Sequence, residues 1–342
     1  MSKNVTIVDI AKEAGVSIST VSRVLTGNAR VNKEKEIEVK RVIKKYNFKP
    51  NILARGLINS HSNLIGILTA DIRNPFYSTL FVNCEQSALE AGYSLMLCNS
   101  FSDRLNEFTL IDKLVQQKVD AIILIGGACD ELKTDSEFAQ KITRISQSIP
   151  VVTVGHLSGT NCTSILINME KVMNLVMDFL TKNSHIKKIA FAGGSSTVAS
   201  TNTMRTVFKK LLKKHHLEYF PEFDIQNERY DEDGGYESMN EILKKDSHPD
   251  AVIAVNDISA AGIIRSIHEH NLRIPQDISV ISFGNTYLSS LLNPSLTTVG
   301  CNFRTFGGEI IKTALSLIKK EPVQKEILIE PSLTIRNSCI AE

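Results

Sequence analysis

The sequence predicts a small all-α domain at the N-terminus, followed by an α/β core of two subdomains, each built on a parallel sheet. Residues 6–26 contain two short helical patterns joined by one tight turn. From residue 63 onward, short apolar runs alternate with longer amphipathic segments. The 342 residues are also too many for one typical hydrophobic core. We therefore expect two or three domains.

The first helical pair is defined by its apolar spacing and by the residues that end and start helices. Residues 7–14 carry an apolar stripe at helical spacing. Gly15 can adopt the left-handed conformation that ends a helix, and Ser17 can cap the next one. Val21 and Val24 of the second helix are expected to face inward. This pattern is typical of a helix-turn-helix unit.

The outward face of the second helix carries small polar side chains and an arginine. Ile18, Ser19, Ser22 and Arg23 are expected on this face. A short helix that presents Ser and Arg in this way suits the major groove of double-stranded DNA. The alternative interpretation is an ordinary helical hairpin without a nucleic-acid partner.

A third helix is predicted from about residue 32 to 46. Its side chains expected to cover the first two helices are Ile37, Val39, Val42, Ile43 and Tyr46. It ends before Pro50, because the residue that precedes a proline leaves the helical region. We assign residues 1–50 to the helical headpiece, 51–62 to a hinge and 63–342 to the core.

The core pattern predicts parallel strands that are covered by helices on both faces. The expected strands are 64–69, 94–98, 121–125, 151–154, 164–167, 188–192, 251–255, 280–283, 327–330 and 333–336. The expected helices are 77–91, 103–117, 169–183, 203–216, 235–245, 259–270 and 306–320. The pattern separates into two halves near residue 160.

Charge is distributed unevenly along the chain. Residues 1–60 hold 12 basic and five acidic side chains, a net charge of +7, whereas the whole chain carries +2. The remaining residues are therefore mildly acidic. A basic N-terminal segment followed by a mildly acidic remainder is typical of a DNA-binding module that is joined to a sensor domain.

Composition excludes several classes of protein. No leading basic and apolar segment resembles a secretion signal, and no run of about 18 apolar residues could cross a membrane. The six cysteines are scattered without metal-ligand spacing, so we expect reduced thiols and no metal site. We therefore expect a cytoplasmic protein without a membrane partner or a cofactor.

Residues 6–25 read T-I-V-D-I-A-K-E-A-G-V-S-I-S-T-V-S-R-V-L. This segment resembles the headpiece signature of the LacI/GalR (lactose-repressor) family, and residues 294–299 and 331–338 resemble two later motifs of that family. The resemblance implies a transcriptional repressor, not an enzyme, whose core is similar to periplasmic sugar-binding proteins. It also implies a homodimer that reads a near-palindromic operator and responds to a small-molecule effector.

The resemblance implies DNA contacts from the headpiece and from the hinge. Pro50-Asn51 and Ala54-Arg55-Gly56-Leu57 resemble the family's hinge motif, whose leucine wedges into the minor groove at the centre of the operator. The alternative is a linker with one isolated leucine. The implied DNA-contacting residues are Thr6, Ser17, Ile18, Ser19, Thr20, Ser22, Arg23, Arg30, Asn51, Ala54 and Leu57.

The effector cleft is expected beyond the carboxyl ends of the core strands. The residues that the resemblance implies there are Phe76, Tyr77, Arg205, Tyr230, Asn256 and Asp257. Arg205 is expected to hold a hydroxyl or an acidic group with its fork of donors. Asp257 is expected to accept hydroxyl hydrogen bonds, to cap the following helix, or both. The alternatives are core packing for Phe76 and Tyr77, and surface positions for Arg205 and Tyr230.

Two departures from the family affect the predicted ligand. Gly284 stands where the family usually has an aspartate that clamps a sugar or a purine, and His156 follows a strand end that often carries another aspartate. A small hydroxylated ligand, a sugar or a sugar phosphate, is the preferred hypothesis. With Arg205 as its main contact, an anionic group is favoured.

Two other classes of function compete with a repressor. A transport-type binding protein would explain the core but not the basic headpiece. A nucleotide-dependent enzyme would need a phosphate-binding motif, and Gly193-Gly194-Ser195 does not form one.

Overall fold

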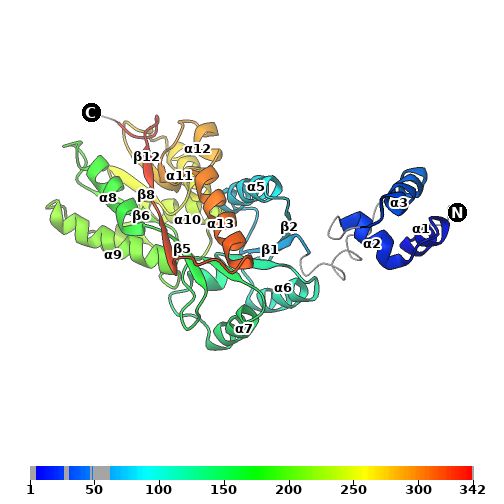
Figure 1. Ribbon diagram of the computed structural model, residues 1–342. Coiled ribbons are helices and arrows are strands. Elements are labelled where there is room, and N and C mark those ends of the chain that lie inside the picture. The colour runs from blue at the N-terminus through cyan, green and yellow to red at the C-terminus, as the bar shows by residue number, and fades with distance from the viewer. Residues whose placement is uncertain (1–4, 27–30, 47, 49–61, 341–342) are drawn as a thin grey trace. The chain divides into compact units, whose positions relative to one another are not determined.

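The computed structural model describes residues 5–26, 31–46, 48 and 62–340. Contacts divide the chain into two compact units, residues 1–62 and 63–342. The first unit is the helical headpiece and the second is the α/β core (Figure 1). Arg30, Asn51, Ala54 and Leu57, which the resemblance implies in DNA contacts, lie outside the described residues.

The headpiece contains three helices, α1 (Ile7–Glu13), α2 (Ile18–Thr26) and α3 (Lys33–Lys45). Thr6 caps α1 in a reciprocal arrangement with Asp9, because each side chain bonds to the backbone N–H of the other residue. Gly15 has a φ of +62°, which confirms the left-handed turn between α1 and α2. The side chain of Ser17 accepts the backbone N–H of Thr20 at 3.2 Å, as expected of a cap.

A small apolar core holds the three helices together. Its fully or nearly buried side chains are Ile10, Ala11, Ala14, Val21, Val39 and Val42. Two expectations were wrong here. Ile37 is 67% exposed and does not cover the other helices, whereas Ser22 is buried rather than outward-facing. Ser22 immediately follows the inward-facing Val21 on α2, so it lies at the edge of the apolar face.

The first subdomain of the core is built on a parallel sheet with strand order β11-β5-β4-β3-β1-β2. Its strands are β1 (Leu64–Thr69), β2 (Ser94–Asn99), β3 (Ala121–Ile125), β4 (Val151–Val154), β5 (Thr163–Ile167) and β11 (Glu326–Ile329). Its helical elements are α5 (Pro75–Glu90), α6 (Arg104–Gln116), η1 (Gly127–Asp130), α7 (Ser136–Ser146) and α13 (Phe303–Ile318). Helices α5 and α13 cover one face, and α6 and α7 cover the other.

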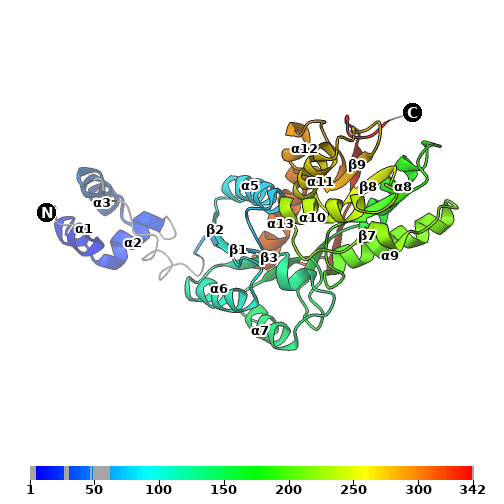
Figure 2. The same cartoon turned by 180° about the vertical axis from the view of Figure 1, so that it is seen from behind.

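The second subdomain has strand order β12-β10-β9-β8-β6-β7 and is parallel except for β12, which runs antiparallel to β10. Its strands are β6 (Ile189–Ala192), β7 (Asp224–Ile225), β8 (Ala251–Ala254), β9 (Ser279–Gly284), β10 (Thr297–Gly300) and β12 (Ser332–Thr334). Its helices are α8 (Met169–Leu180), α9 (Ala199–Lys214), η2 (Pro221–Phe223), α10 (Glu232–Leu243), α11 (Asp257–Glu269) and α12 (Leu288–Leu291). Helices α10 and α11 pack side by side on one face (Figure 2), and α8 and α9 cover the other.

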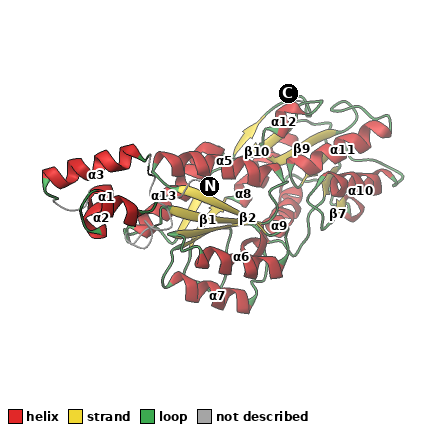
Figure 3. Cartoon of the chain, turned by 90° about the vertical axis from the view of Figure 1, so that its right-hand side faces the viewer, coloured by secondary structure: helices red, strands yellow, loops and turns green. Residues whose placement is uncertain are grey.

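The strands lie between helical layers (Figure 3), which explains why the central strands β3, β6 and β8 are apolar throughout. The expected division of the core into consecutive halves near residue 160 was wrong. The chain leaves the first sheet after β5, returns to it through α13 and β11, and ends in the second sheet with β12. Helix α13 packs directly on α5, where a Cβ on Gly307 would lie 2.8 Å from the backbone of Asn83. The subdomains are therefore joined by three crossings.

No helix in the described part of the chain is long and apolar enough to cross a membrane.

Candidate DNA-binding surface and ligand cavity

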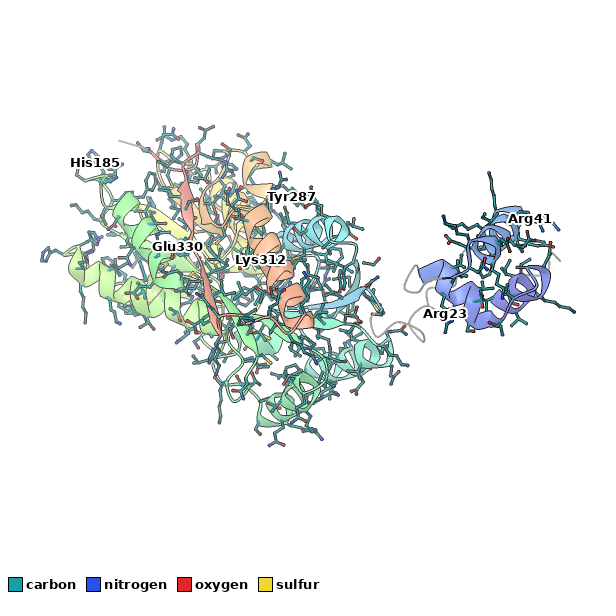
Figure 4. All side chains as sticks on the ribbon, viewed as in Figure 1. Arg23, Arg41, His185, Tyr287, Lys312 and Glu330 are labelled. Atoms are coloured by element: carbon teal, nitrogen blue, oxygen red, sulfur yellow. The ribbon has the colours of Figure 1, made fainter. Side chains whose placement is uncertain are left out.

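The start of α2 presents a polar surface that a DNA groove can receive. Ser17, Ser19 and Arg23 are exposed, and Ile18 is 48% exposed. The hydroxyl of Ser17 lies 2.8 Å from that of Ser19 and 2.9 Å from that of Thr20, so these residues form one small cluster. Figure 4 shows Arg23 on α2, apart from Arg41 on α3. The helix therefore exposes the residue types that read bases and contact phosphates.

Thr6 has a structural role in the headpiece, and Ser22 is largely buried there. The hydroxyl of Thr6 donates to Asp9 at 2.7 Å and caps α1, although the residue stays exposed. Ser22 is only 9% exposed, so its side chain offers little surface to DNA. Of the predicted contacts in the described headpiece, Ser22 is the one whose placement disagrees.

Helix α3 contributes less free positive charge than its sequence indicates. Lys40 pairs with Glu36 at 2.6 Å, Arg41 with Glu38 at 2.7 Å and Lys45 with Glu13 at 2.6 Å. The third pair joins α3 to α1. Exposed pairs of this kind contribute little to stability, but they neutralise part of the basic run. These pairs therefore reduce the positive charge that α3 can offer to phosphates.

A cavity of about 550 Å³ lies between the two subdomains of the core. The start of α5, the ends of β3, β4 and η1, strand β5 and Leu328 of β11 line it from the first subdomain. The start of α9, the end of β8 and β9 line it from the second. Its size is that of a small-molecule site, and its position at strand ends is the one expected for open α/β sheets.

Phe76 and Tyr77 both line this cavity and also pack against the core of the first subdomain. The ring of Phe76 makes edge contacts with Tyr77 and Phe303 at 5.5 and 5.6 Å between centroids. Burial raises the pKa of Tyr77 well above its ordinary value, so its hydroxyl stays protonated. The two interpretations offered for these residues, core packing and cavity lining, both hold.

Tyr230 and Asn256 line the cavity from the second subdomain, but their polar atoms already have partners. The hydroxyl of Tyr230 accepts the backbone N–H of Ser195 and pairs with the hydroxyl of Thr201, each at 2.9 Å. The side chain of Asn256 caps α11 and donates to the carbonyl of Tyr230 at 3.0 Å. These two residues therefore shape the cavity wall and hold each other in place.

Arg205 does not line the cavity, which corrects the expectation that it holds the ligand. It is 4% exposed, and its Nε donates to Asp224 at 2.7 Å. Its terminal nitrogens donate to the carbonyls of Gly193, Gly194 and Ile225 at 2.7–2.9 Å. The guanidinium also lies over the ring of Phe191, 4.6 Å from the centroid. Arg205 therefore has a structural role, because its hydrogen bonds connect α9 to β7 and to the residues that follow β6.

Asp257 also lies outside the cavity lining. Its buried carboxylate accepts hydrogen bonds from Ser282 at 2.5 Å, from Thr298 at 3.0 Å, and from the backbone and hydroxyl of Thr286 at 2.7 and 2.8 Å. Burial raises its pKa, and these hydrogen bonds oppose the rise. A Cβ on Gly284 would lie 3.0 Å from this carboxylate, so Asp257 occupies the space that an additional side chain would enter. The role expected for Asp257 in ligand binding is therefore corrected to a structural one.

Sequence reasoning missed a contact that joins the two subdomains at the cavity. Asp130 of η1 accepts the hydroxyl of Ser200 at 2.6 Å and its backbone N–H at 3.0 Å. Next to it, the N–H of Leu132 donates to the carbonyl of Thr197 at 2.8 Å. Burial raises the pKa of Asp130, while the bonds from Ser200 oppose this. We call the hydrogen bonds between Asp130 and Ser200 and between Leu132 and Thr197 the inter-subdomain clasp. Asp130 lies shortly after the strand β3, and this position near a strand end is the sequence signal that could have predicted its place at the cavity.

Replacing Asp130 with asparagine is expected to open the clasp. The amide removes the negative charge and replaces one of the two oxygens that accept from Ser200 with a donor, and a hydrogen bond to a charged group contributes about 1.5–3 kcal/mol. The backbone N–H of Ser200 should then exchange with solvent about tenfold faster or more, measured by hydrogen-exchange mass spectrometry. Asp135→Asn is the control, because asparagine also caps a helix and Asp135 only caps α7. An unchanged exchange rate in Asp130→Asn would contradict the clasp.

The described residues contain no group of three or more His, Cys, Asp or Glu side chains that could hold a metal ion. All six cysteines are free and buried. Burial raises the pKa of Cys84, Cys301 and Cys339 to about 12, so these three are thiols rather than reactive thiolates.

Comparisons with known proteins match both units of the chain to a family. A model of bacterial regulatory proteins of the lacI family matches residues 6–51, and a model of a periplasmic binding protein-like domain matches residues 178–339. The chain is 30% identical over 334 residues to catabolite control protein A of Staphylococcus xylosus, covering 96% of each protein. It is also 30% identical to the HTH-type transcriptional repressor PurR of Histophilus somni, covering 97% of this chain and 98% of that one.

Among solved structures, the Lac repressor dimer bound to operator and the anti-inducer ONPF matches with a TM-score of 0.87 and 25% identity. The match covers 99% of this chain and all of that one. The helical headpiece, the two-sheet core and the near full-length similarity to regulators of this kind lead to one conclusion: the chain belongs to the lacI family of bacterial regulatory proteins.

Proposed function

We propose that this protein is a sequence-specific transcriptional repressor whose affinity for DNA is controlled by a small molecule bound in the core cavity. The observation that carries the proposal is the headpiece, where α2 exposes Ser17, Ile18, Ser19 and Arg23 at the start of a capped helix. A relative of nearly equal length is named as a repressor, and the similar Lac repressor is bound to an operator. A regulator of this kind is proposed to act in the cytoplasm and not as an enzyme.

The proposed DNA contacts come from Ser17, Ile18, Ser19, Thr20 and Arg23 in the described headpiece. Thr6, Arg30, Asn51, Ala54 and Leu57 are proposed as further contacts by resemblance, and the last four lie outside the described residues. The domain limits that we propose remain 1–50 for the headpiece, 51–62 for the hinge and 63–342 for the core.

The proposed assembly is a homodimer on a near-palindromic operator. The similar Lac repressor structure is a dimer on its operator, which supports this state. Two-fold symmetry in the protein would place one α2 in each half-site of the DNA.

The proposed effector is a small hydroxylated molecule, such as a sugar, in the cavity lined by Phe76, Tyr77, Tyr230 and Asn256. A ligand there touches both subdomains and can favour one relative arrangement of them over another. Coupling of about 1–3 kcal/mol between effector and DNA is typical for such linkage.

Gel retardation with fragments of genomic DNA tests the repressor proposal. Competitor DNA and increasing salt should leave a small set of specifically shifted fragments, because specific sites bind about 10³–10⁷ times tighter than other DNA. A transport-type binding protein or an enzyme would give no such fragments.

Replacing Leu57 with alanine is expected to weaken operator binding much more than binding to unrelated DNA. A wedge in the minor groove acts only in the specific complex, where the duplex is kinked. Circular-permutation assays should show a smaller bend angle for the variant than for the parent chain. An unchanged angle would show that Leu57 is not the wedge.

A further inference from the structure

We propose that the core cavity selects an uncharged ligand with a substantial apolar part and discriminates against phosphorylated ligands. This inference rests on the proposed role of the cavity as the effector site. It deepens that role by naming the chemical class of the ligand, and it replaces the expectation of an anionic one.

The cavity offers no cationic side chain to an anion. Among the described residues, no lysine or arginine lines it. The nearest candidate from the sequence, Arg205, is buried outside the lining, with Asp224 and three backbone carbonyls as its partners. Freeing this guanidinium for a phosphate would leave the buried carboxylate of Asp224 without its main partner.

The ionisable side chains that do line the cavity include two carboxylic acids. Asp130 is half-buried in the clasp with Ser200, and Glu170 is exposed at the start of α8. His156 is the third ionisable lining residue apart from the tyrosines, and it is exposed. A phosphate would therefore meet the negative charge of carboxylates in a confined space without a fixed cation to offset it.

The wall is mostly apolar, and its apolar side chains come from both subdomains. They are Phe76, Tyr77, Ile125, Val154, Ile165, Leu166, Ile167, Met169, Met204, Tyr230, Val255, Phe283 and Leu328. A ligand that fills a site of this kind buries most of its surface against such side chains and uses few polar contacts for orientation. A sugar would match this wall best through an apolar substituent, which an unsubstituted polyol lacks.

Two uncharged polar groups of the first subdomain remain available to a ligand. The hydroxyl of Tyr77 and the amide nitrogen of Asn74 have no protein partner among the described residues. In the second subdomain, the lining side chains of Ser200, Thr201 and Thr203 already bond to Asp130, Tyr230 and the carbonyl of Ala199. The hydroxyl of Tyr77 and the amide of Asn74 can therefore orient a hydroxyl group of the ligand from the first subdomain, while apolar side chains of both subdomains contact the rest of it.

Binding of 4-fluorobenzyl alcohol and 4-fluorobenzyl phosphate to the full-length protein, followed by ¹⁹F NMR titration, tests this inference. A simple aromatic alcohol is a suitable probe because apolar cavities bind small aromatic molecules without exact stereochemical fit. The alcohol should bind at least tenfold more tightly than the phosphate. Equal or tighter binding of the phosphate would overturn the inference, and so would failure of the parent chain to bind the alcohol at millimolar concentration.

Three variants test where the alcohol binds and whether the missing cation explains the weak binding of the phosphate. Met169→Trp fills part of the cavity from a half-buried position and should abolish binding of the alcohol, whereas Leu105→Trp, 77% exposed on α6 outside the lining, should not. Leu328→Lys adds a cation at a lining position that is 53% exposed, so folding should be retained. This variant should bring the phosphate to within about threefold of the alcohol.

Alcohol binding that survives in Met169→Trp, or a phosphate that stays excluded in Leu328→Lys, would contradict the assignment. DNA binding is measured separately on the same samples. Selective probe binding without specific DNA binding would reject the repressor proposal alone, whereas specific DNA binding without probe selectivity would reject the present inference alone.

Discussion

Replacing Arg205 with alanine is expected to lower the free energy of unfolding by about 3–5 kcal/mol, because it leaves the carboxylate of Asp224 buried without its main partner. Asp224 is 5% exposed in its side chain, and Arg205 also holds three backbone carbonyls from two strand ends. Denaturant unfolding of the full-length protein, followed by circular dichroism, measures the change. A loss below about 1 kcal/mol would contradict the structural role assigned to Arg205.

Lys209→Ala is the matched control for Arg205→Ala. Its ammonium lies 3.0 Å from the same carboxylate, but its side chain is 45% exposed. Solvent screening limits such a pair to about 1 kcal/mol or less. Both substitutions remove one positive charge next to the carboxylate of Asp224. The difference between their unfolding free energies therefore measures the contribution of the burial of Arg205 and of its hydrogen bonds to backbone carbonyls.

The effect of Arg205→Ala is also expected to depend on pH. Burial alone would raise the pKa of Asp224, but hydrogen bonds from Arg205 and Lys209 hold it below its ordinary value. A lowered pKa in the folded state stabilises the parent above about pH 4, and this contribution is lost as the pH falls through the folded pKa. The variant loses the pairing that lowers this pKa. The stability difference between the two proteins should therefore be largest at neutral pH and should shrink toward pH 3.

Arg23→Ala is expected to reduce affinity for the operator by about 1–3 kcal/mol, because an arginine on the groove-facing side of α2 can bond to base edges. Arg23 is exposed on α2, so its removal should leave the fold of the headpiece intact. Fluorescence anisotropy with the operator and with an unrelated duplex measures both affinities. Equal operator affinity for variant and parent would reject this assignment.

Arg41→Ala is the matched control on α3, where the side chain is 57% exposed and pairs with Glu38 at 2.7 Å. If Arg41 contacts only phosphates or no DNA at all, its loss should weaken specific and unrelated DNA about equally. Selective loss of operator affinity in Arg41→Ala, rather than in Arg23→Ala, would place the reading surface on α3.

Local sequence signals predicted most of the fold. The buried strands β1, β3 and β4 coincide with their apolar runs, because a strand covered on both faces needs apolar side chains throughout. Helix α7 was missed. It lies in a long segment between β3 and β4, and it packs an apolar face of Phe138, Ala139 and Ile142 against the first sheet.

Topology and site chemistry were harder to predict, because they depend on contacts between distant segments. The return of β11 to the first sheet pairs residues 326–329 with 164–167, and periodicity carries no information about such a pairing. Phe76, Tyr77, Tyr230 and Asn256 line the cavity as expected, because each lies in a loop near a strand end or a helix start. Arg205 and Asp257 instead bond within the second subdomain, and their partners lie 11–41 residues away along the chain.

Sequencing the genomic fragments that the pure full-length protein retains at physiological salt is the most direct test of the central claim. The account predicts a shared, near-palindromic sequence among these fragments, because two copies of α2 related by a two-fold axis read two half-sites. It also predicts that Arg23→Ala no longer enriches that sequence. Retention without a shared sequence, or enrichment that is unchanged in Arg23→Ala, would contradict the account.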